Sequence, residues 1–489
     1  MAAYVLARAQ ALRDKVAVSV VSPHSIEALT YGDLRAAVLG TGTGLLRAGC
    51  KPGDKVVLRL GNTIDFPIAY LGALAVGVIP VPTSAALTEP EVAQIMNDMR
   101  PRIVLHDPNV ASAPGAPHMG LDALRALRTL PPAQWDMGDP DRLAYVIYTS
   151  GTSGMPRAVG HAHRAIWARQ MMHQGWCGLR TDDVLMHAGA FNWTYTLGTG
   201  LIDPWTVGAR ALIPSAGTPP EALATLMAAH DVTIFAAAPG VYRQMLTRTS
   251  LPALPHLRHG LSAGEKLQPA MLTAWRDASG TPIFEAYGLS ECSTFISACP
   301  EAPCDPDMLG RAQSGRRVAI LGTDGVVARN TPGVIAVHRT DPGLMLGYLH
   351  HSDETAARFQ GDWFLTGDMG EMDDTGQIRY LGRNDDMMNA GGYRVSPIEV
   401  ETALTAAPGI TSAGAAEIEV KPGVRVIAAF YTSATALDET ALRTYVEANL
   451  AHYKHPRAYI RIGQMPTGTN GKILRRRLSQ FWPQKTKAP

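Results

Sequence analysis

Short apolar runs alternate with segments of helical periodicity before residue 383 of the chain. The runs at 55–59, 102–105 and 143–149 have the length of buried strands, whereas 220–230 spaces its apolar residues as a helix does. Strands that alternate with helices predict an α/β fold with a largely parallel sheet. Ligands in such folds bind at the carboxyl ends of strands, so we expect functional residues in the loops that follow them.

Chain length and composition narrow the class of protein. The 489 residues are 46% hydrophobic and 18% charged, which is typical of a globular chain rather than a disordered one. A prior of about 150 residues per domain would divide this length into about three domains. The longest apolar stretch, at 70–82, is shorter than the ~20 residues that cross a bilayer, so we expect no membrane span.

The net charge and the positions of the cysteines exclude further classes of protein. The net charge of +1 argues against a protein that coats nucleic acid or an anionic membrane. The five cysteines form no CxxC pair, so neither a disulfide framework nor a zinc site is indicated. The first 15 residues have the pattern of a short helix rather than of a secretory signal. We therefore expect a cytoplasmic protein with no nucleic-acid or membrane partner.

The balance of charge changes at residue 383. Residues 383–489 contain 14 basic and 9 acidic residues, a balance of +5, whereas residues 1–382 contain 30 basic and 34 acidic residues, a balance of −4. The stretch that begins at Lys472 has six basic residues and no acidic one. This contrast predicts two domains, 1–382 and 383–489.

The segment at 149–157, TSGTSGMPR, follows the expected strand 143–149. Its glycines allow the backbone to approach a polyphosphate, its hydroxyls add donors, and Arg157 adds positive charge, which together predict a phosphate-binding loop. The segment is not a Walker A loop, because its glycines are three apart and no Lys-Ser/Thr pair follows. An ordinary polar turn is the alternative for this segment taken alone.

The same segment resembles TSGTTGxPK, the signature of the adenylate-forming superfamily, which includes acyl-CoA synthetases, non-ribosomal peptide adenylation domains and firefly luciferase. Ser153 stands where Thr is usual, and Arg157 stands where Lys is usual. Because Arg keeps the charge but presents a planar fork, the geometry of phosphate contact is expected to differ. Further motifs of the family follow in its order, at 262–267, 286–291, 363–368, 381–386, 389–401 and 466–475.

The resemblance implies roles for individual residues in nucleotide binding. Tyr287 would stack near the adenine, Ser290 would hydrogen-bond the α-phosphate, and Glu291 would hold the Mg²⁺ that bridges phosphate oxygens. Asp368 would accept hydrogen bonds from both ribose hydroxyls, and Arg383 would be a second ribose or phosphate contact. The remaining residues that it places at the nucleotide are Thr149, Ser150, Gly151, Thr152, Ser153, Gly154, Arg157, Gly264, Glu265, Ala286 and Gly288.

The resemblance also implies a large N-terminal domain of several subdomains, with mixed and largely parallel sheets, followed by a small mobile α+β lid. Asp385 would be the hinge between them, and Lys472 would be the lysine that assists adenylation. In the thioester-forming pose, the loop at 389–401 would line the pantetheine tunnel of coenzyme A. The residues of this loop assigned to the tunnel are Gly391, Gly392 and Arg394.

The acid-binding segment is expected at 186–209. Its pattern resembles benzoate- and hydroxybenzoate-CoA ligases, and the spacing from Trp193 to Pro204 also resembles short- and medium-chain acyl-CoA synthetases. Aromatic and small side chains would form a compact apolar pocket; packing in the core is the alternative for the aromatic ones. The segment 186–202 has no carboxylate to pair a substrate amino group. The residues expected to line the pocket are Phe191, Trp193, Tyr195, Ala238 and Gly240.

The sequence thus predicts an ATP-dependent acid–CoA ligase that forms an acyl-AMP and then an acyl-CoA thioester from a small aromatic or similarly compact carboxylic acid. ATP, Mg²⁺ and coenzyme A would be required. The alternatives are a short- or medium-chain fatty acyl-CoA synthetase, a stand-alone enzyme that loads a carrier protein, and a non-catalytic adenylate or acyl-CoA sensor. The oligomeric state stays open, with a homodimer as one option.

Overall fold

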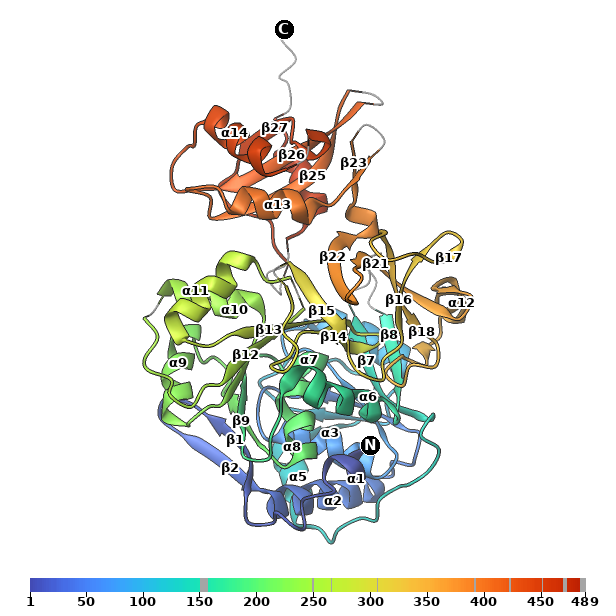
Figure 1. Ribbon diagram of the computed structural model, residues 1–489. Coiled ribbons are helices and arrows are strands. Elements are labelled where there is room, and N and C mark those ends of the chain that lie inside the picture. The colour runs from blue at the N-terminus through green and yellow to red at the C-terminus, as the bar shows by residue number, and fades with distance from the viewer. Residues whose placement is uncertain are drawn as a thin grey trace.

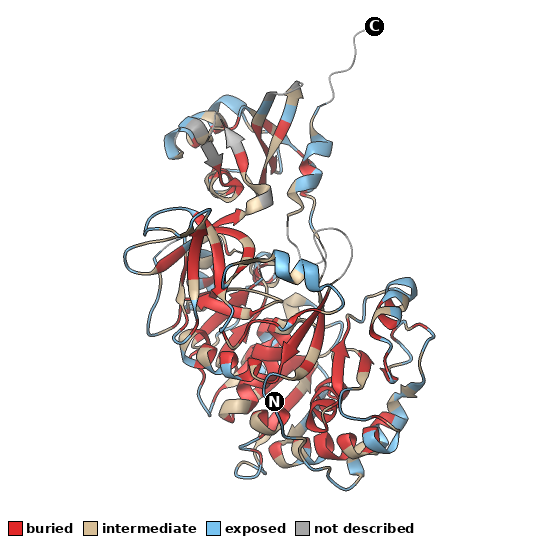
Figure 2. Cartoon of the chain, turned by 90° about the vertical axis from the view of Figure 1, so that its right-hand side faces the viewer, coloured by how far each residue is buried: buried red, intermediate tan, exposed pale blue. Residues whose placement is uncertain are grey.

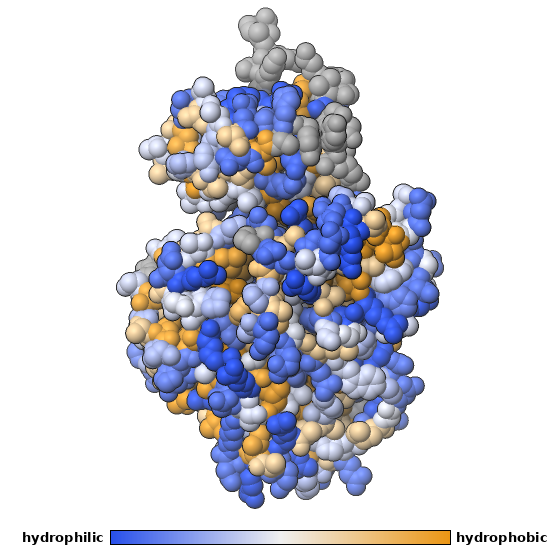
Figure 3. Space-filling model, in the orientation of Figure 1, coloured by the Kyte–Doolittle hydropathy of each residue, from blue (hydrophilic) through white to orange (hydrophobic). Residues whose placement is uncertain are grey.

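The computed structural model describes residues 1–149, 157–248, 250–264, 266–305, 307–390, 393–421, 424–450, 452–468 and 473–483. A large body carries a smaller C-terminal lobe, which holds the orange and red elements at the top of Figure 1. The molecule is narrower between the body and the lobe than in either of them (Figure 3). Within the described part of the chain, no helix is long and apolar enough to cross a membrane.

One half of the largest sheet is parallel, because helices join its strands. The α9 helix, Pro220–Ala229, confirms the helix predicted at 220–230, and α10 (Pro239–Arg248) and α11 (Pro269–Ser279) follow. All three pack on one face of the sheet through a cluster that includes Phe235 and Trp275 (Figure 1). In sheet order, the parallel strands are β1 (Val16–Val21), β10 (Arg210–Pro214), β9 (Val184–His187), β11 (Ile234–Ala236), β12 (His259–Ala263) and β13 (Ile283–Leu289).

The other half of this sheet is antiparallel, so the fold is mixed. Here most strands follow one another without an intervening helix, apart from α12 (Ser352–Ala357), and the alternation before residue 383 did not predict this arrangement. The outer strand β2 (Ile26–Thr30) is antiparallel to β1. The antiparallel strands beyond β13 are β14 (Ser293–Ser297), β15 (Met308–Ala312), β22 (Gln377–Arg383), β21 (Trp363–Met372), β18 (Gly333–His338), β16 (Val318–Gly322) and β17 (Gly325–Val326).

Two smaller sheets complete the body. A parallel sheet contains β4 (Ile79–Pro82), β3 (Lys55–Arg59), β5 (Ile103–His106) and β6 (His118–Gly120). Its strands β4, β3 and β5 are largely buried, whereas β6 at the edge is exposed. Figure 2 shows buried strands inside the body and exposed residues on the helices at its surface. The antiparallel sheet contains β19 (Gly347–Tyr348), β8 (Arg157–Ala162) and β7 (Leu143–Thr149), so the expected phosphate-binding segment joins two strands of a hairpin. The helices that accompany them are α1 (Ala2–Val5), α2 (Tyr31–Arg47), α3 (Asp65–Ala75), α4 (Glu89–Met99), α5 (Leu121–Ala126), α6 (Ala165–Met172), α7 (Thr194–Leu197), α8 (Asp203–Val207) and α12 (Ser352–Ala357).

The C-terminal lobe has its own core. Two hydrophobic clusters fill it, and neither contains a residue before Met388 among those described. The boundary between residues 382 and 383 itself stays a prediction, because β22 of the body ends at Arg383. The elements of the lobe are β23 (Met388–Ala390), β24 (Tyr393–Val395), α13 (Pro397–Thr405), β25 (Ser412–Lys421), β26 (Val424–Thr432), α14 (Glu439–Asn449) and β27 (Ala458–Arg461).

Candidate active site

Asp368 lies at the centre of a cluster formed by three strands. Tyr287, near the end of β13, donates its hydroxyl hydrogen to Asp368 Oδ2 at 2.6 Å, and Tyr380 on β22 donates to Oδ1 at 3.3 Å. Arg383 Nε lies 3.4 Å from Oδ1. The structure therefore brings together three residues that the sequence assigned to one nucleoside, and it adds Tyr380, which carried no motif signal.

The local backbone explains how Asp368 reaches this position. Asp368 and Arg383 are paired directly across β21 and β22, and a register shift follows at Met369. Gly367 has φ +81°, a conformation that a residue with a Cβ rarely adopts. Burial raises the pKa of Tyr287 well above its usual range, so its hydroxyl stays protonated and donates to the Asp368 carboxylate.

A second cluster surrounds Glu291. Tyr348 on β19 donates its hydroxyl hydrogen to Glu291 Oε1 at 2.7 Å, and the Arg157 guanidinium lies 5.6 Å from the centre of the Tyr348 ring. Arg157 also forms an ion pair with Glu354 on α12, which raises its pKa. The predicted phosphate residue Arg157 and the predicted metal ligand Glu291 thus both contact Tyr348, the first over its ring and the second at its hydroxyl.

Main-chain contacts hold the segment 290–294, which carries the expected catalytic residues. His161 lies 2.7 Å from the Ser290 carbonyl oxygen, and the Met345 N–H donates to the Glu291 carbonyl at 2.7 Å. The Arg316 guanidinium donates to the carbonyls of Cys292 and Thr294 at 3.1 and 2.8 Å. Met345 and Arg316 did not stand out in the sequence, because such contacts depend on chain segments that lie far apart.

Arg169 connects this segment to the expected acid-binding region. Its guanidinium donates to Ser293 Oγ at 3.0 Å and to both carboxylate oxygens of Asp203 at 2.7 and 2.6 Å. Asp203 begins α8, directly after a π-helical turn at Gly198–Ile202. Despite burial, the Arg169 cation keeps the pKa of Asp203 below its usual value, so the carboxylate is ionised.

The aromatic residues expected at the acid lie in different surroundings. Phe191 is buried against Phe66, with ring centres 5.5 Å apart, and Tyr195 is buried and donates its hydroxyl hydrogen to the Leu261 carbonyl at 2.9 Å. Trp193 is half-buried, and its indole covers Gly264 of the expected adenine-binding motif. Of the small residues, Ala238 is half-buried, and a Cβ added at Gly240 would meet no atom within 4 Å. Their contact with an acid stays a prediction.

Two histidines that follow the expected phosphate-binding segment, His161 and His163, have partners within the body. His161 stacks on Tyr145, with ring centres 4.8 Å apart, and His163 Nδ1 lies 3.0 Å from the Met1 amino group. Burial lowers the pKa of His161 to about 4, so the ring is neutral at pH 7. Within the described residues, no group of three His, Cys, Asp or Glu side chains could hold a metal ion.

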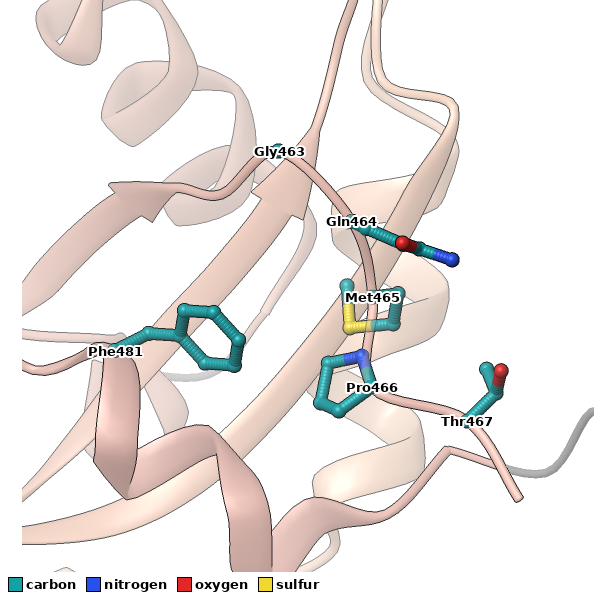
Figure 4. A pocket seen from close by; sticks show the side chains of 6 residues that line it. All are labelled: Gly463, Gln464, Met465, Pro466, Thr467 and Phe481. Atoms are coloured by element: carbon teal, nitrogen blue, oxygen red, sulfur yellow. The ribbon is translucent and has the colours of Figure 1, made fainter.

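The motif at 466–475, which contains the expected adenylation lysine, begins at a surface pocket of about 680 Å³ in the lobe. Figure 4 shows Met465, Pro466 and Thr467 along one strand-like segment, with Phe481 facing them. Arg475, at the other end of the motif, donates to both carboxylate oxygens of Glu401 at 2.7 and 2.6 Å and to Asp386 at 3.4 Å. Arg475 therefore ties this end of the motif to α13 and to the turn Asn384–Asp386, which contains the expected hinge.

Several predicted residues lie outside the described residues, so their roles stay predictions. The side chains of Asp385 and Arg394 are also outside the description, although their backbones belong to the hinge turn and to β24. Thr149, Ala286 and Gly288 are described, in β7 and β13. The predicted residues outside the description are Ser150, Gly151, Thr152, Ser153, Gly154, Glu265, Gly391, Gly392 and Lys472.

Comparison with known proteins identifies the family of the chain. The family model described as AMP-binding enzyme matches residues 6–349. The chain is similar to a benzoate–CoA ligase of Thauera aromatica, with 30% identity over 92% of this chain and 90% of the relative. It is similar to a 3-hydroxybenzoate–CoA ligase of Aromatoleum sp. (strain CIB), with 28% identity over 97% and 94%.

A solved structure agrees with these relatives over almost the whole chain. The crystal structure of a benzoate CoA ligase from Burkholderia xenovorans LB400 matches with a TM-score of 0.86 and 25% identity, covering 98% of this chain and 99% of that one. The mixed sheet and the C-terminal lobe are both included in this match. The chain belongs to the AMP-binding enzyme family.

Proposed function

We propose that the protein is an ATP-dependent acid–CoA ligase for a small aromatic carboxylic acid. In the first step, the acid's carboxylate attacks the α-phosphate of ATP, which gives an acyl-AMP and releases pyrophosphate. In the second step, the thiol of coenzyme A attacks the acyl carbon and AMP leaves. The Asp368 cluster is the observation that carries the proposal, because it unites Tyr287, Arg383 and a carboxylate suited to a ribose.

The residues of the two clusters would contact different parts of ATP. A carboxylate has about four acceptor positions, so Asp368 can accept from ribose hydroxyls beside its present partners. Arg157 and Ser290 would contact the phosphates. Glu291 suits Mg²⁺, because its second carboxylate oxygen accepts no hydrogen bond from the described residues and hard cations prefer oxygen ligands. When bound, Mg²⁺ would neutralise phosphate charge.

The choice of an aromatic acid rests on the relatives and on the acid-binding segment. Both relatives are named for benzoates, and the segment at 186–209 places Trp193 and Tyr195 with ring centres 5.2 Å apart. The Trp193 indole lies against Gly264 of the expected adenine motif. An acid held by this segment would therefore have its carboxylate close to the nucleotide.

The two steps need different groups from the lobe. Lys472 would stabilise the charge that develops during adenylation, whereas Gly391 and Gly392 would admit the thiol arm of coenzyme A. A rotation of the lobe about Asp385 would exchange these groups. The molecule is narrower between body and lobe than in either part (Figure 3), which supports such a motion.

The test is exchange of labelled pyrophosphate into ATP in the presence of benzoate. Wild-type protein is expected to catalyse the exchange, and Lys472→Ala is expected to lose it by at least about 100-fold, as removal of a group that stabilises developing charge does. The same variant should still convert preformed benzoyl-AMP and coenzyme A into the thioester. Lys485→Ala, another lysine of the basic terminal stretch, is the matched control. Normal exchange by Lys472→Ala would overturn the lysine assignment.

A substrate screen separates the alternatives for the acid and the acceptor. AMP release would be measured with benzoates, heteroaromatic acids and straight-chain fatty acids, each with coenzyme A or with a phosphopantetheinylated carrier protein. Preference for aromatic acids and free coenzyme A is expected. Preference for every straight-chain acid over every aromatic one would contradict the substrate, and use of the carrier alone would contradict the acceptor.

A further inference from the structure

Arg358 follows α12 directly and lies outside every motif named from the sequence. Its N–H donates to the Thr355 carbonyl at 3.2 Å, and its own carbonyl accepts from the Leu365 N–H at 2.7 Å. These two contacts fix the backbone from which the side chain extends. The guanidinium lies over the Phe364 ring, 5.8 Å from its centre. The side chain therefore packs against β21, the strand that carries Asp368.

The end of this side chain reaches Gly367, the residue before Asp368. A Cβ added at Gly367 would lie 3.3 Å from Arg358 Nη1 and 3.6 Å from Arg383 Nη2. Two guanidinium groups therefore lie on the same side of Gly367, next to the expected ribose carboxylate. Both arginine side chains are half-buried, so each is partly open to solvent. Two cations at one place that solvent reaches are suited to an anionic ligand.

Arg358 also lies beside the Glu291 cluster. Its charge interacts with the Tyr348 hydroxyl, which donates to Glu291, and with the Glu354 carboxylate. Asp368 is the expected ribose ligand, and Glu291 is the expected metal ligand at the phosphates. Because the phosphates of ATP are attached to the ribose, a phosphate chain that extends from Asp368 to Glu291 would pass close to Arg358.

The ion pairs of the site distinguish Arg358 from its neighbours. Arg157 pairs with Glu354, and Arg383 pairs with Asp368. Arg358 forms no ion pair with a carboxylate in the part of the chain that the structure describes, and it contacts the Phe364 ring instead. A phosphate could therefore pair with Arg358 without displacing a carboxylate.

We propose that Arg358 binds the phosphate chain of ATP, between the ribose at Asp368 and the phosphate oxygens at Glu291. A guanidinium suits this position, because its planar fork donates two parallel hydrogen bonds to phosphate oxygens. This proposal rests on the proposed function and adds a binding residue to its nucleotide site.

The first test measures binding instead of turnover. Isothermal titration calorimetry, with neither acid nor coenzyme A present, would give the Kd of MgATP and the Kd of adenosine, which has no phosphates. Arg358→Gln should raise the Kd of MgATP about 10- to 100-fold, as loss of a hydrogen bond to a charged group does, and should leave the Kd of adenosine within about twofold. Adenosine thus reports whether the ribose site of the variant is intact.

Two further variants separate charge from packing. Arg358→Lys keeps a positive charge that can bind phosphate, so it should bind MgATP more tightly than Arg358→Gln does. Arg339→Gln is the matched control, because the Arg339 guanidinium lies 5.1 Å from the centre of the Phe359 ring, which packs against Phe364. Arg339 pairs with Asp362. The control should leave both Kd values unchanged.

The outcomes that contradict the inference differ from the one that contradicts the proposed function. An unchanged Kd of MgATP in Arg358→Gln would refute the phosphate contact. Equal increases for MgATP and adenosine would show that Arg358 acts only through its packing against β21. A loss of the same size in Arg339→Gln would show an effect of surface charge alone. If wild-type protein bound neither ligand, the proposed function would be refuted, and the inference with it.

Discussion

Asp368 illustrates how much of the site depends on single side chains. Its carboxylate is 9% exposed and joins Tyr287, Tyr380 and Arg383. Each of these groups donates toward it, which fixes its orientation before a nucleotide arrives. A carboxylate held this way can accept ribose hydroxyls without first losing conformational entropy.

Asp368→Asn is predicted to raise the KM for ATP about tenfold or more and to leave the KM for the acid within about twofold. The amide keeps the size of the side chain but loses the charge, and hydrogen bonds to charged groups are worth roughly 1.5–3 kcal/mol each against roughly 0.5–1.5 kcal/mol for neutral ones. Steady-state AMP release with each substrate varied would measure both constants. Asp373→Asn, in the turn between β21 and β22, is the control. Equal changes in both KM values would contradict the ribose role.

At the scale of elements, two buried ion pairs hold the segment that carries Ser290 and Glu291. Arg316 pairs with Asp341 and donates to two carbonyls of the segment, while Arg169 pairs with Asp203 and donates to Ser293. Removing one partner of such a pair typically costs 3–5 kcal/mol, whereas replacing both with apolar residues is often tolerated. Paired replacement therefore separates positioning from folding.

The double variant Arg316→Met with Asp341→Leu is predicted to lower kcat/KM for ATP by about 10- to 100-fold, because small displacements of reacting groups have effects of this size. The matched control is Arg258→Met with Asp183→Leu, a pair at the amino ends of β9 and β12, away from the site. The two double variants should lower the Tm of the protein by similar amounts. A similar loss of activity in the control would contradict the positioning role.

At the scale of the whole molecule, the buried histidines of the body make its stability depend on pH. His259 is 2% exposed, contacts the Cys177 carbonyl oxygen at 2.9 Å, and has its pKa lowered to about 4 by burial. The unfolded chain binds this proton from about pH 6.5 downward, but the folded chain does not. The contribution to stability is therefore complete above that pH and declines as the pH falls toward 4.

Wild-type protein is predicted to lose about 2 kcal/mol of unfolding free energy through His259 alone between pH 7.5 and pH 5. His259→Gln should be less stable than wild type at pH 7.5 and should show a decline that is smaller by this amount. Urea unfolding of both proteins at the two pH values would measure the difference. Parallel declines would show that His259 is protonated equally in the folded and unfolded chains.

The sequence predicted the elements whose signal is local. The strand at 143–149 and the helix at 220–230 were predicted correctly, because burial of one face of an element sets the order of apolar and polar residues along the chain. The resemblance implied mixed sheets, but the strands that pair antiparallel could not be named from the sequence, since strand pairing is decided by contacts between distant segments. The change in charge balance, from −4 before residue 383 to +5 after it, predicted a boundary at this residue. The exact position of that boundary stays a prediction.

For the site, the order of motifs along the chain was enough to indicate the family and to nominate Tyr287, Asp368 and Arg383. Their convergence on one carboxylate became visible only in the fold. The supporting residues Tyr380, Tyr348 and Arg316 had no motif signal, because what distinguishes them is a partner in a distant segment. The residue types and their spacing determine which functional groups the chain contains. Burial and distance, which only the tertiary structure defines, decide which of these groups contact one another.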